Sequence, residues 1–214
     1  MKKLVIFDLD GTVLDTTEDI ADCMNMAITE LGFEPRTYPE YRKVIGNDAP
    51  NFVRKLLGDM PYEKLMYIWN YYIPFVEKYG TNKTKVFKGI KEVCFALKEK
   101  GDKIVAYTNK TPDELEPFID KFLKDLRFDL VVGVGGTEDA KPAPSGVEKV
   151  LKKFNISPQN TYIVGDGETD VLTAINAGVN CIAVTWGCRD RDFLENYGAK
   201  IFADTPEQLL DLIK

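Results

Sequence analysis

The sequence predicts an α/β fold: a Rossmann-like parallel sheet with helices on both faces, plus an all-helical segment inserted after the first strand. Short apolar runs rich in Val and Ile recur between turn residues, which is typical of buried parallel strands. Amphipathic segments separate these runs, and strand–helix alternation indicates a sheet covered on both faces. The predicted strands are Lys3–Phe7, Ile104–Thr108, Leu130–Val134, Tyr162–Gly165 and Cys181–Thr185.

One segment interrupts the alternation directly after the first strand. From about residue 16 to residue 79, apolar residues recur at helical spacing and no run predicts a convincing strand. We expect helices over Glu18–Leu31, Asn51–Leu57 and Glu63–Tyr79, the last with an aromatic cluster typical of a small core. Residues 1–15 and 80–214 are therefore predicted to form an α/β core domain. Residues 16–79, the helical insertion, are predicted to form a cap domain. Its position would suit a lid that excludes water from a site beside it, and the alternative is a helical bundle that only stabilises the fold.

The later helices carry start and stop signals. Ile90–Lys100 has apolar residues at helical spacing and stops at Gly101, a common C-terminal residue. Pro112–Leu126 follows Thr111, a suitable N-cap, and begins with proline at the first helical position. Further helices are expected over Pro144–Phe154, Thr169–Ala177 and Pro206–Ile213.

The composition excludes several kinds of function. The chain has no histidine, so Ser-His-Asp catalysis, Cys-His catalysis and histidine-ligated zinc are ruled out. Its formal net charge is −6 and no Lys/Arg cluster stands out, which argues against nucleic acid or an anionic membrane as a partner. The four cysteines form no Cys-x-x-Cys pair, and no apolar run approaches the length of a membrane span. We therefore expect a reduced, cytoplasmic setting.

Two carboxylates follow the first predicted strand. Asp8 and Asp10 are two residues apart, so they share one face if the strand continues, and Gly11 then allows a sharp turn. Two anions this close need a cation or a shared proton. The pair is therefore a candidate for metal binding, for acid/base chemistry, or for both, although Asp-Gly also ends many strands without any function.

Other polar groups follow later strands, where ligands bind in open α/β sheets. Thr108 and Asn109 end one strand and could hold a phosphate-like anion. Lys141 stands before a proline-led helix and could neutralise a phosphate or a carboxylate. Asp166 ends another strand and Asp170 lies in the following helical turn, where it also suits the helix dipole.

With these four motifs in this order, the chain resembles the haloacid dehalogenase superfamily of phosphohydrolases over essentially its whole length. The motifs are Asp8-Leu-Asp10-Gly-Thr, Thr108-Asn109, Lys141-Pro and Gly165-Asp166-Gly-Glu-Thr-Asp170. The helical insertion is similar to the C1-type cap of that superfamily. The stretch from Ile45 to Pro50, followed by Arg54, resembles phosphoglycolate-phosphatase-like members.

The resemblance implies a Mg²⁺-dependent phosphatase acting on a small phosphorylated metabolite, with 2-phosphoglycolate as one candidate. It assigns Asp8 as the nucleophile that forms an aspartyl-phosphate, and Asp10 as the acid and then the base. The protein is expected to be a monomer or a homodimer, since a helical insertion can mediate pairing or remain free. Mg²⁺ would be held by Asp8, the backbone carbonyl of Asp10, Asp166 and Asp170, and the phosphoryl group by Thr108, Asn109 and Lys141.

Other functions stay open at this stage. A β-phosphoglucomutase-like mutase and an inorganic pyrophosphatase would use the same motifs, and a non-catalytic binding protein could reuse the fold. A phosphonatase would need a lysine from the insertion, such as Lys43 or Lys55. Candidate substrate-recognition residues in the insertion are Arg42, Asn47 and Arg54.

Overall fold

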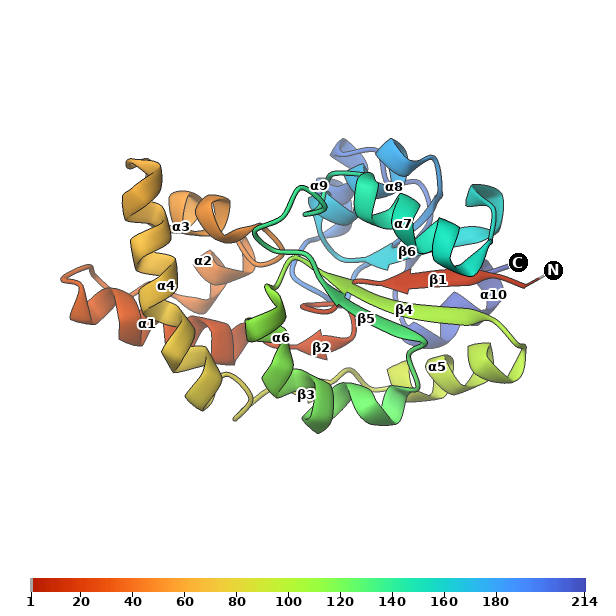
Figure 1. The fold of residues 1–214 in the computed structure, drawn as a ribbon, viewed down its shortest axis with the longest axis horizontal. Coiled ribbons are helices and arrows are strands. Elements are labelled where there is room, and N and C mark those ends of the chain that lie inside the picture. The colour runs from red at the N-terminus through yellow and green to blue at the C-terminus, as the bar shows by residue number, and fades with distance from the viewer. Residues whose placement is uncertain (1) are drawn as a thin grey trace.

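The computed structural model describes residues 2–214, and its centre is a six-stranded parallel sheet (Figure 1). The strand order is β5-β4-β1-β6-β7-β8, and every neighbouring pair is parallel. This confirms the predicted Rossmann-like sheet. The strands are β1 Leu4–Phe7, β4 Lys103–Thr108, β5 Leu130–Gly133, β6 Thr161–Gly165, β7 Asn180–Val184 and β8 Phe202–Ala203.

Helices cover both faces of the sheet, as predicted. In Figure 1, α5 and α6 lie below it and α7 and α8 lie above it. Side chains alternate along β1, so Val5 and Phe7 belong to one hydrophobic cluster. Leu4 and Ile6 belong to the other, together with Val147 of α7. These helices are α5 Ile90–Glu99, α6 Pro112–Phe118, α7 Ser145–Phe154 and α8 Glu168–Ala177.

The helical insertion lies beyond the carboxyl ends of the strands, at the left of Figure 1. Its aromatic side chains form a core: the ring centroid of Trp69 lies 5.4 Å from that of Phe52 and 5.1 Å from that of Tyr72. Three of its helices begin and end within two residues of the predicted bounds, and the short α2 was not predicted. The four are α1 Thr17–Glu30, α2 Tyr38–Arg42, α3 Ala49–Leu57 and α4 Tyr62–Tyr79.

A two-stranded antiparallel ladder stands where the chain leaves and re-enters the core. It pairs β2 (Leu14–Asp15) with β3 (Lys85–Val86), a feature that the sequence pattern did not predict. Next to it, the buried Asp19 carboxylate accepts backbone hydrogen bonds from Lys83 at 2.9 Å and Thr84 at 2.7 Å. We propose that this ladder is the boundary between the core domain and the cap domain.

Two predicted helices differ from expectation in their winding. The run predicted over residues 112–126 is α-helical only to Phe118, then continues as a π-helical turn over Ile119–Leu123 and a 3₁₀ turn over Lys124–Leu126. Pro117 lies inside α6, where its ring removes one backbone donor and disturbs regular winding. The final segment is a 3₁₀ turn followed by α10 (Leu209–Leu212). The short elements β8 and α9 (Arg191–Asn196) were not predicted.

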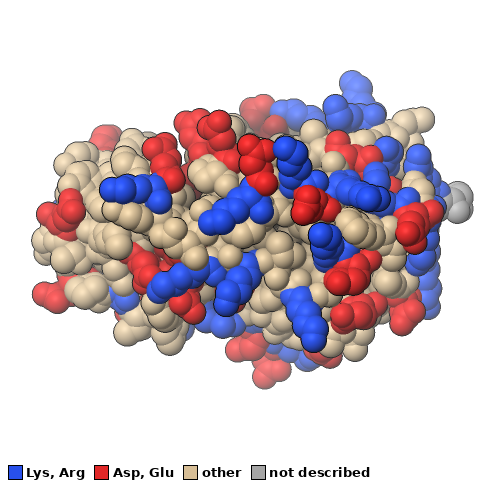
Figure 2. All heavy atoms as spheres, turned by 90° about the horizontal axis from the view of Figure 1, so that it is seen from below, with Lys and Arg blue, Asp and Glu red and all other residues tan. Residues whose placement is uncertain are grey.

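The surface carries both signs of charge. On the face in Figure 2, basic and acidic side chains are interspersed rather than sorted into separate regions. None of the helices within residues 2–214 combines the length and hydrophobicity that crossing a bilayer requires.

Candidate active site

The predicted site residues meet at the carboxyl edge of the sheet. In the parallel register, Phe7 of β1 lies opposite Ala106 of β4 and Val164 of β6, so the ends of these three strands are adjacent. Asp8 follows β1 directly, and its backbone N–H donates to the carbonyl of Val164 at 2.8 Å. Thr108 ends β4 and Asp166 directly follows β6, so three residues that are far apart in the sequence meet in one site.

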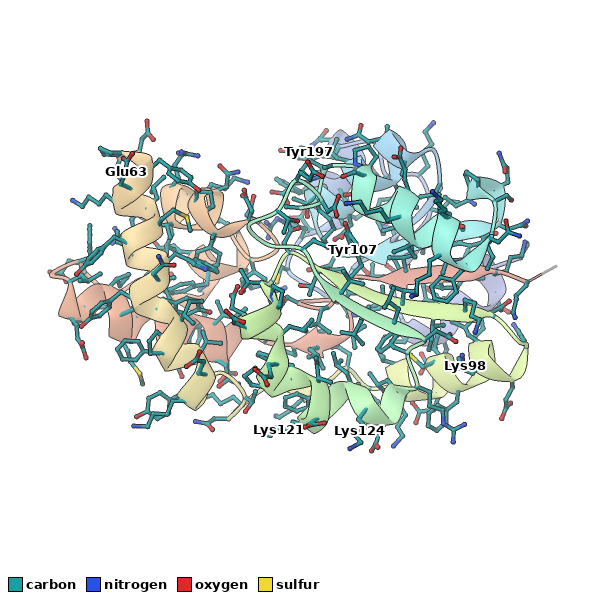
Figure 3. All side chains as sticks on the ribbon, in the orientation of Figure 1. Glu63, Lys98, Tyr107, Lys121, Lys124 and Tyr197 are labelled. Atoms are coloured by element: carbon teal, nitrogen blue, oxygen red, sulfur yellow. The ribbon has the colours of Figure 1, made fainter. Side chains whose placement is uncertain are left out.

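Lys141 links two of the acids. Its Nζ lies 2.6 Å from Oδ1 of Asp8 and 2.6 Å from Oδ1 of Asp170, and all three side chains are buried. The loop that carries Lys141 is tied to β4 at Tyr107 (Figure 3), whose hydroxyl donates to the Asp139 carbonyl at 2.7 Å. The position of Lys141 is therefore fixed by the contact between its loop and Tyr107 as well as by its ion pairs.

Three carboxylates crowd around this lysine. One oxygen each from Asp8, Asp166 and Asp170 lies within 4.8 Å of the others, and all three residues are buried. Burial, followed by the charge of Asp170, raises the pKa of Asp8 well above its ordinary value, and the same two causes raise the pKa of Asp166 to about 6. Burial opposes the charge of Lys141, but Asp170 and Asp8 outweigh it and raise the lysine pKa. The cluster therefore has more negative charge than Lys141 alone can balance.

A hard divalent cation fits this donor set. The cluster offers only carboxylate oxygens, the ligands that Mg²⁺ and similar ions prefer, and contains no sulfur or imidazole. The carboxylate of Asp10, predicted at the metal through its backbone carbonyl, is not part of the cluster.

Asp10 has a different environment from Asp8. Its Oδ1 accepts a hydrogen bond from Thr16 Oγ1 at 2.7 Å and lies 3.0 Å from Nζ of Lys110. Its Oδ2 accepts a longer hydrogen bond from Thr108 Oγ1 at 3.4 Å. Lys110, which is buried, was not predicted as a site residue, although it directly follows the Thr108-Asn109 motif. The two acids of the first motif thus each face a separate lysine.

Gly11 allows the first motif and Asp166 to lie very close to each other. It has φ +90°, which side chains rarely allow, and a Cβ there would lie 2.2 Å from Oδ2 of Asp166. This close approach sets Asp166 against the first motif, where Thr12 Oγ1 donates to its Oδ1 at 3.0 Å. The backbone N–H of Cys188 donates to its Oδ2 at 2.6 Å.

Asn109 acts on the backbone around the site. Its Oδ1 accepts from the backbone N–H of Lys141 at 2.7 Å, and its Nδ2 donates to the carbonyls of Lys141 and Gly46, each at 3.1 Å. Thr169 Oγ1 also donates to the Gly46 carbonyl, at 3.3 Å. Both core residues therefore hold the α2–α3 connection of the helical insertion over the site.

Arg189, which the sequence pattern did not single out, strengthens this connection. It lies after β7, is 6% exposed, and its Nε donates to Oε2 of Glu168 at 3.0 Å. Its guanidinium also donates to three carbonyls of the insertion, those of Arg42, Lys43 and Ile45. Burial opposes ionisation of Glu168, but the Arg189 charge prevails and lowers the pKa of that carboxyl. A lone arginine in a loop gives no pattern from which this role could be predicted.

Replacement of Arg189 by methionine is expected to lower the free energy of unfolding by about 3 kcal/mol, because the buried Glu168 loses a partner and three carbonyls lose their donor. Urea unfolding measures the change. The control is Arg191→Met, since Arg191 pairs with Asp204 at the surface with its side chain 42% exposed, and it should have little effect. Equal, small changes in both variants would contradict the anchoring role of Arg189.

The candidate recognition residues of the insertion have different positions. Asn47 lines a small cavity next to Asp10. Arg42 instead donates to the Gly187 carbonyl, and Arg54 pairs with Asp59 at 3.1 Å on an exposed face. Lys55 lies 3.1 Å from Oε1 of Glu168, so its amine joins the contact between insertion and core. The structure thus brings only Asn47 of the three predicted recognition residues into the cavity.

Comparison with known proteins gives a consistent assignment. A family model described as haloacid dehalogenase-like hydrolase matches residues 5–184. The phosphoglycolate phosphatase of Pseudomonas fluorescens is 28% identical over 222 residues, which cover 99% of this chain and 77% of that protein. A Caldanaerobacter subterraneus protein named "putative pyrophosphatase PpaX" is 31% identical, over 98% of this chain and 94% of the relative.

The fold is also found among solved structures. A haloacid dehalogenase-like family hydrolase from Streptococcus pneumoniae matches with a TM-score of 0.86 at 20% identity, over 100% of this chain and 99% of that one. The residues matched by the family model contain the first motif, the two flanking strands, Lys141 and Asp170. On this match, and with the motif side chains gathered at one edge of the sheet, the chain belongs to the haloacid dehalogenase-like hydrolase family.

Proposed function

We propose that this hydrolase is a Mg²⁺-dependent phosphatase that cleaves a small phosphate monoester through an aspartyl-phosphate on Asp8. The observation that carries the proposal is the division of the first motif. Asp8 lies in the acid cluster against Lys141, whereas Asp10 lies outside it against Thr16 and Lys110. One carboxylate thus lies beside the cation site, and the other lies outside it, where we assign it the proton transfer.

In the first step, an oxygen of Asp8 forms a bond to phosphorus while the bond from phosphorus to the ester oxygen breaks. Asp10 gives its proton to that leaving oxygen, so the alcohol departs neutral. In the second step, Asp10 takes a proton from water, which attacks phosphorus and releases Asp8 and inorganic phosphate. Asp10 has hydrogen-bond partners of its own, Thr16 and Thr108, which hold its carboxylate apart from the acid cluster.

The transferring phosphoryl group needs positive charge around it. Bound Mg²⁺ would supply part of it by neutralising the phosphoryl oxygens and the acid cluster. Lys141, held by its backbone through Asn109, would supply another part, and the Thr108 hydroxyl would donate to a phosphoryl oxygen. Asn109 therefore contributes by orienting Lys141 rather than through a free amide of its own.

The substrate is tested by phosphate release with Mg²⁺. From the names of its relatives, we infer that 2-phosphoglycolate is the leading candidate. A preference for it over sugar phosphates and nucleotides is the expected result. With glucose 1-phosphate, both phosphate and the isomeric sugar phosphate should be followed, because formation of the isomer without net phosphate release would favour the mutase alternative.

Inorganic pyrophosphate is the second candidate substrate. It is favoured by the relative that carries a pyrophosphatase name, which at 31% has a higher identity than the phosphoglycolate phosphatase from P. fluorescens at 28%. A higher kcat/KM for pyrophosphate than for 2-phosphoglycolate would establish this alternative.

Mg²⁺ affinity is expected to fall about tenfold between pH 7 and pH 5. The pKa of Asp166 is raised to about 6 by burial and by Asp170, so this ligand gains a proton over that range and no longer offers a free carboxylate. Titration calorimetry at a series of pH values measures the change. An affinity that is constant from pH 5 to pH 7 would remove Asp166 from the metal site.

We also infer a reducing, cytoplasmic setting for this activity. Its support is that Cys23, Cys94, Cys181 and Cys188 are all free thiols. A small phosphorylated metabolite is the expected partner, and the protein is proposed to act as a monomer or a homodimer.

A further inference from the structure

The two carboxylate oxygens of Asp10 have unequal surroundings. Oδ1 accepts a hydrogen bond from Thr16 Oγ1 at 2.7 Å and lies 3.0 Å from Nζ of Lys110. Oδ2 accepts a longer hydrogen bond, from Thr108 Oγ1 at 3.4 Å. An ammonium group only donates, so its contact with Oδ1 favours that oxygen without a proton. Oδ2 is therefore the oxygen of Asp10 that is suited to exchange a proton with a ligand.

Oδ2 also lies on the side where the reaction is expected. Under the proposed function, the Thr108 hydroxyl donates to a phosphoryl oxygen, and Oδ2 is 3.4 Å from the same hydroxyl. Asp10 and Thr108 both line a cavity that Asn47 of the insertion lines as well. Since the leaving oxygen is bonded to the phosphorus held beside Thr108, it comes close to Oδ2.

Lys110 has a fixed position in the core. The residue is buried, its backbone N–H donates to Thr108 Oγ1 at 3.2 Å, and its Nζ lies 5.0 Å from the ring centroid of Phe118. Burial opposes the charge of Lys110, but Asp10 and Glu114 outweigh it and raise the lysine pKa. The ammonium group is therefore a charged donor that the surrounding core holds beside Asp10.

One short segment sets the position of both contacts to Asp10. Thr108 ends β4 and Lys110 follows two residues later, while β4 pairs in parallel with β1, the strand that precedes Asp10. Thr16 instead directly precedes α1, the first helix of the insertion. Lys110 thus holds Oδ1 from the sheet, in fixed relation to the hydroxyl that is proposed to bind the phosphoryl group.

We propose that Lys110 is a positioning residue for the reaction: its ammonium group holds Oδ1 of Asp10, so that Oδ2 faces the leaving oxygen. This inference rests on the proposed function, which makes Asp10 the acid. As the bond from phosphorus to the ester oxygen breaks, the proton passes from Oδ2 to that oxygen, and Lys110 keeps its own protons throughout. Lys110 therefore matters for substrates whose leaving oxygen needs a proton.

The test compares two kinds of small phosphate compound that differ in this need. An alkyl phosphate, either 2-phosphoglycolate or ethyl phosphate according to which is hydrolysed faster, has a leaving oxygen that must be protonated, whereas acetyl phosphate releases acetate, a stable anion. Lys110→Met should lower kcat/KM, which reports the step that phosphorylates Asp8, about 10- to 100-fold for the alkyl phosphate and less than about threefold for acetyl phosphate. A packing defect would lower both values together.

Asp10→Asn gives a second readout, because a residue that acts through Asp10 has no effect without it. Asp10→Asn should itself lower kcat/KM more for the alkyl phosphate than for acetyl phosphate, and adding Lys110→Met to it should change either value by less than about threefold. Lys124→Met is the matched control. Lys124 lies on the 3₁₀ turn Lys124–Leu126 (Figure 3) with its side chain 76% exposed, and its replacement should leave both values unchanged.

Equal losses for the two substrates in Lys110→Met, no loss for either, or a full further loss on adding it to Asp10→Asn would overturn the inference and leave the phosphatase assignment intact. If circular dichroism shows that Lys110→Met does not fold, the same comparison in Lys110→Met/Glu114→Gln decides the question, because that variant also neutralises the other acid that acts on Lys110.

Failure of the proposed function has a different result. If Asp10→Asn lowers kcat/KM equally for the two substrates, Asp10 is not the acid, and the inference about Lys110 fails with that assignment. Phosphate release from neither substrate by the unsubstituted protein would reject the phosphatase itself.

Discussion

Replacement of Asp8 by asparagine is expected to reduce phosphate release by at least about 10⁴-fold, because the amide cannot form the aspartyl-phosphate. The fold should persist. The substitution removes one of three clustered carboxylates, and Lys141 keeps its contact of 2.6 Å with Asp170. Without metal, the midpoint of thermal unfolding should therefore be equal to or higher than that of the unsubstituted protein.

The matched control for this prediction is Asp204→Asn. Asp204 pairs with Arg191 at the surface, with its side chain 57% exposed, and its replacement should leave phosphate release unchanged. Mg²⁺-dependent turnover by Asp8→Asn above about one part in a hundred of the normal rate would reject Asp8 as the nucleophile. Mass mapping of a trapped phosphoprotein provides an independent readout of which side chain is modified.

Replacement of Lys141 by methionine is expected to produce the largest loss of stability among these variants. It leaves the carboxylates of Asp8, Asp166 and Asp170 within 4.8 Å of one another without their cation. Removing one member of a buried charge network costs about 3–5 kcal/mol, so the metal-free protein should unfold at much lower denaturant concentration. Activity should also be lost, because in the proposed mechanism Lys141 shares with Mg²⁺ the neutralisation of the phosphoryl group.

Mg²⁺ distinguishes this electrostatic explanation from a simple packing defect. A bound cation replaces part of the lost charge, so saturating Mg²⁺ should stabilise Lys141→Met more than it stabilises the unsubstituted protein. The control is Lys149→Met, which removes an exposed lysine from the nearby helix α7. If Mg²⁺ stabilises Lys141→Met no more than it stabilises Lys149→Met, the lysine does not balance the acid cluster.

The main strands could be predicted from the sequence because each is a short apolar run that packs on both sides. β1 and β6 are buried throughout and lie within one residue of the predicted bounds. The two-residue strands β2, β3 and β8 are too short to show any period, and tertiary pairing creates them. The π-helical turn at Ile119–Leu123 could not be predicted either, since Pro117 signals a disturbance but not the winding that follows it.

The site residues that could be predicted from the sequence are those that lie at the ends of predicted strands. Parallel register then brings Asp8, Thr108 and Asp166 together without further information. The contacts of Lys110 and Arg189 depend on long side chains and on where the helical insertion lies, which no local pattern encodes. Trp69 was predicted as part of an aromatic core, and only the three-dimensional arrangement shows that its N–H lacks an acceptor.

The β2–β3 ladder has an evolutionary consequence. It sets Leu14 opposite Val86 and Asp15 opposite Lys85. The chain therefore leaves the α/β core and re-enters it at neighbouring points. The six strands of the main sheet, and the strand ends that carry Asp8 and Asp166, all lie outside the segment between these two points. Under the proposed function, substrate preference can therefore change with the sequence of the inserted segment, while Asp8, Asp166 and Asp170 stay in place.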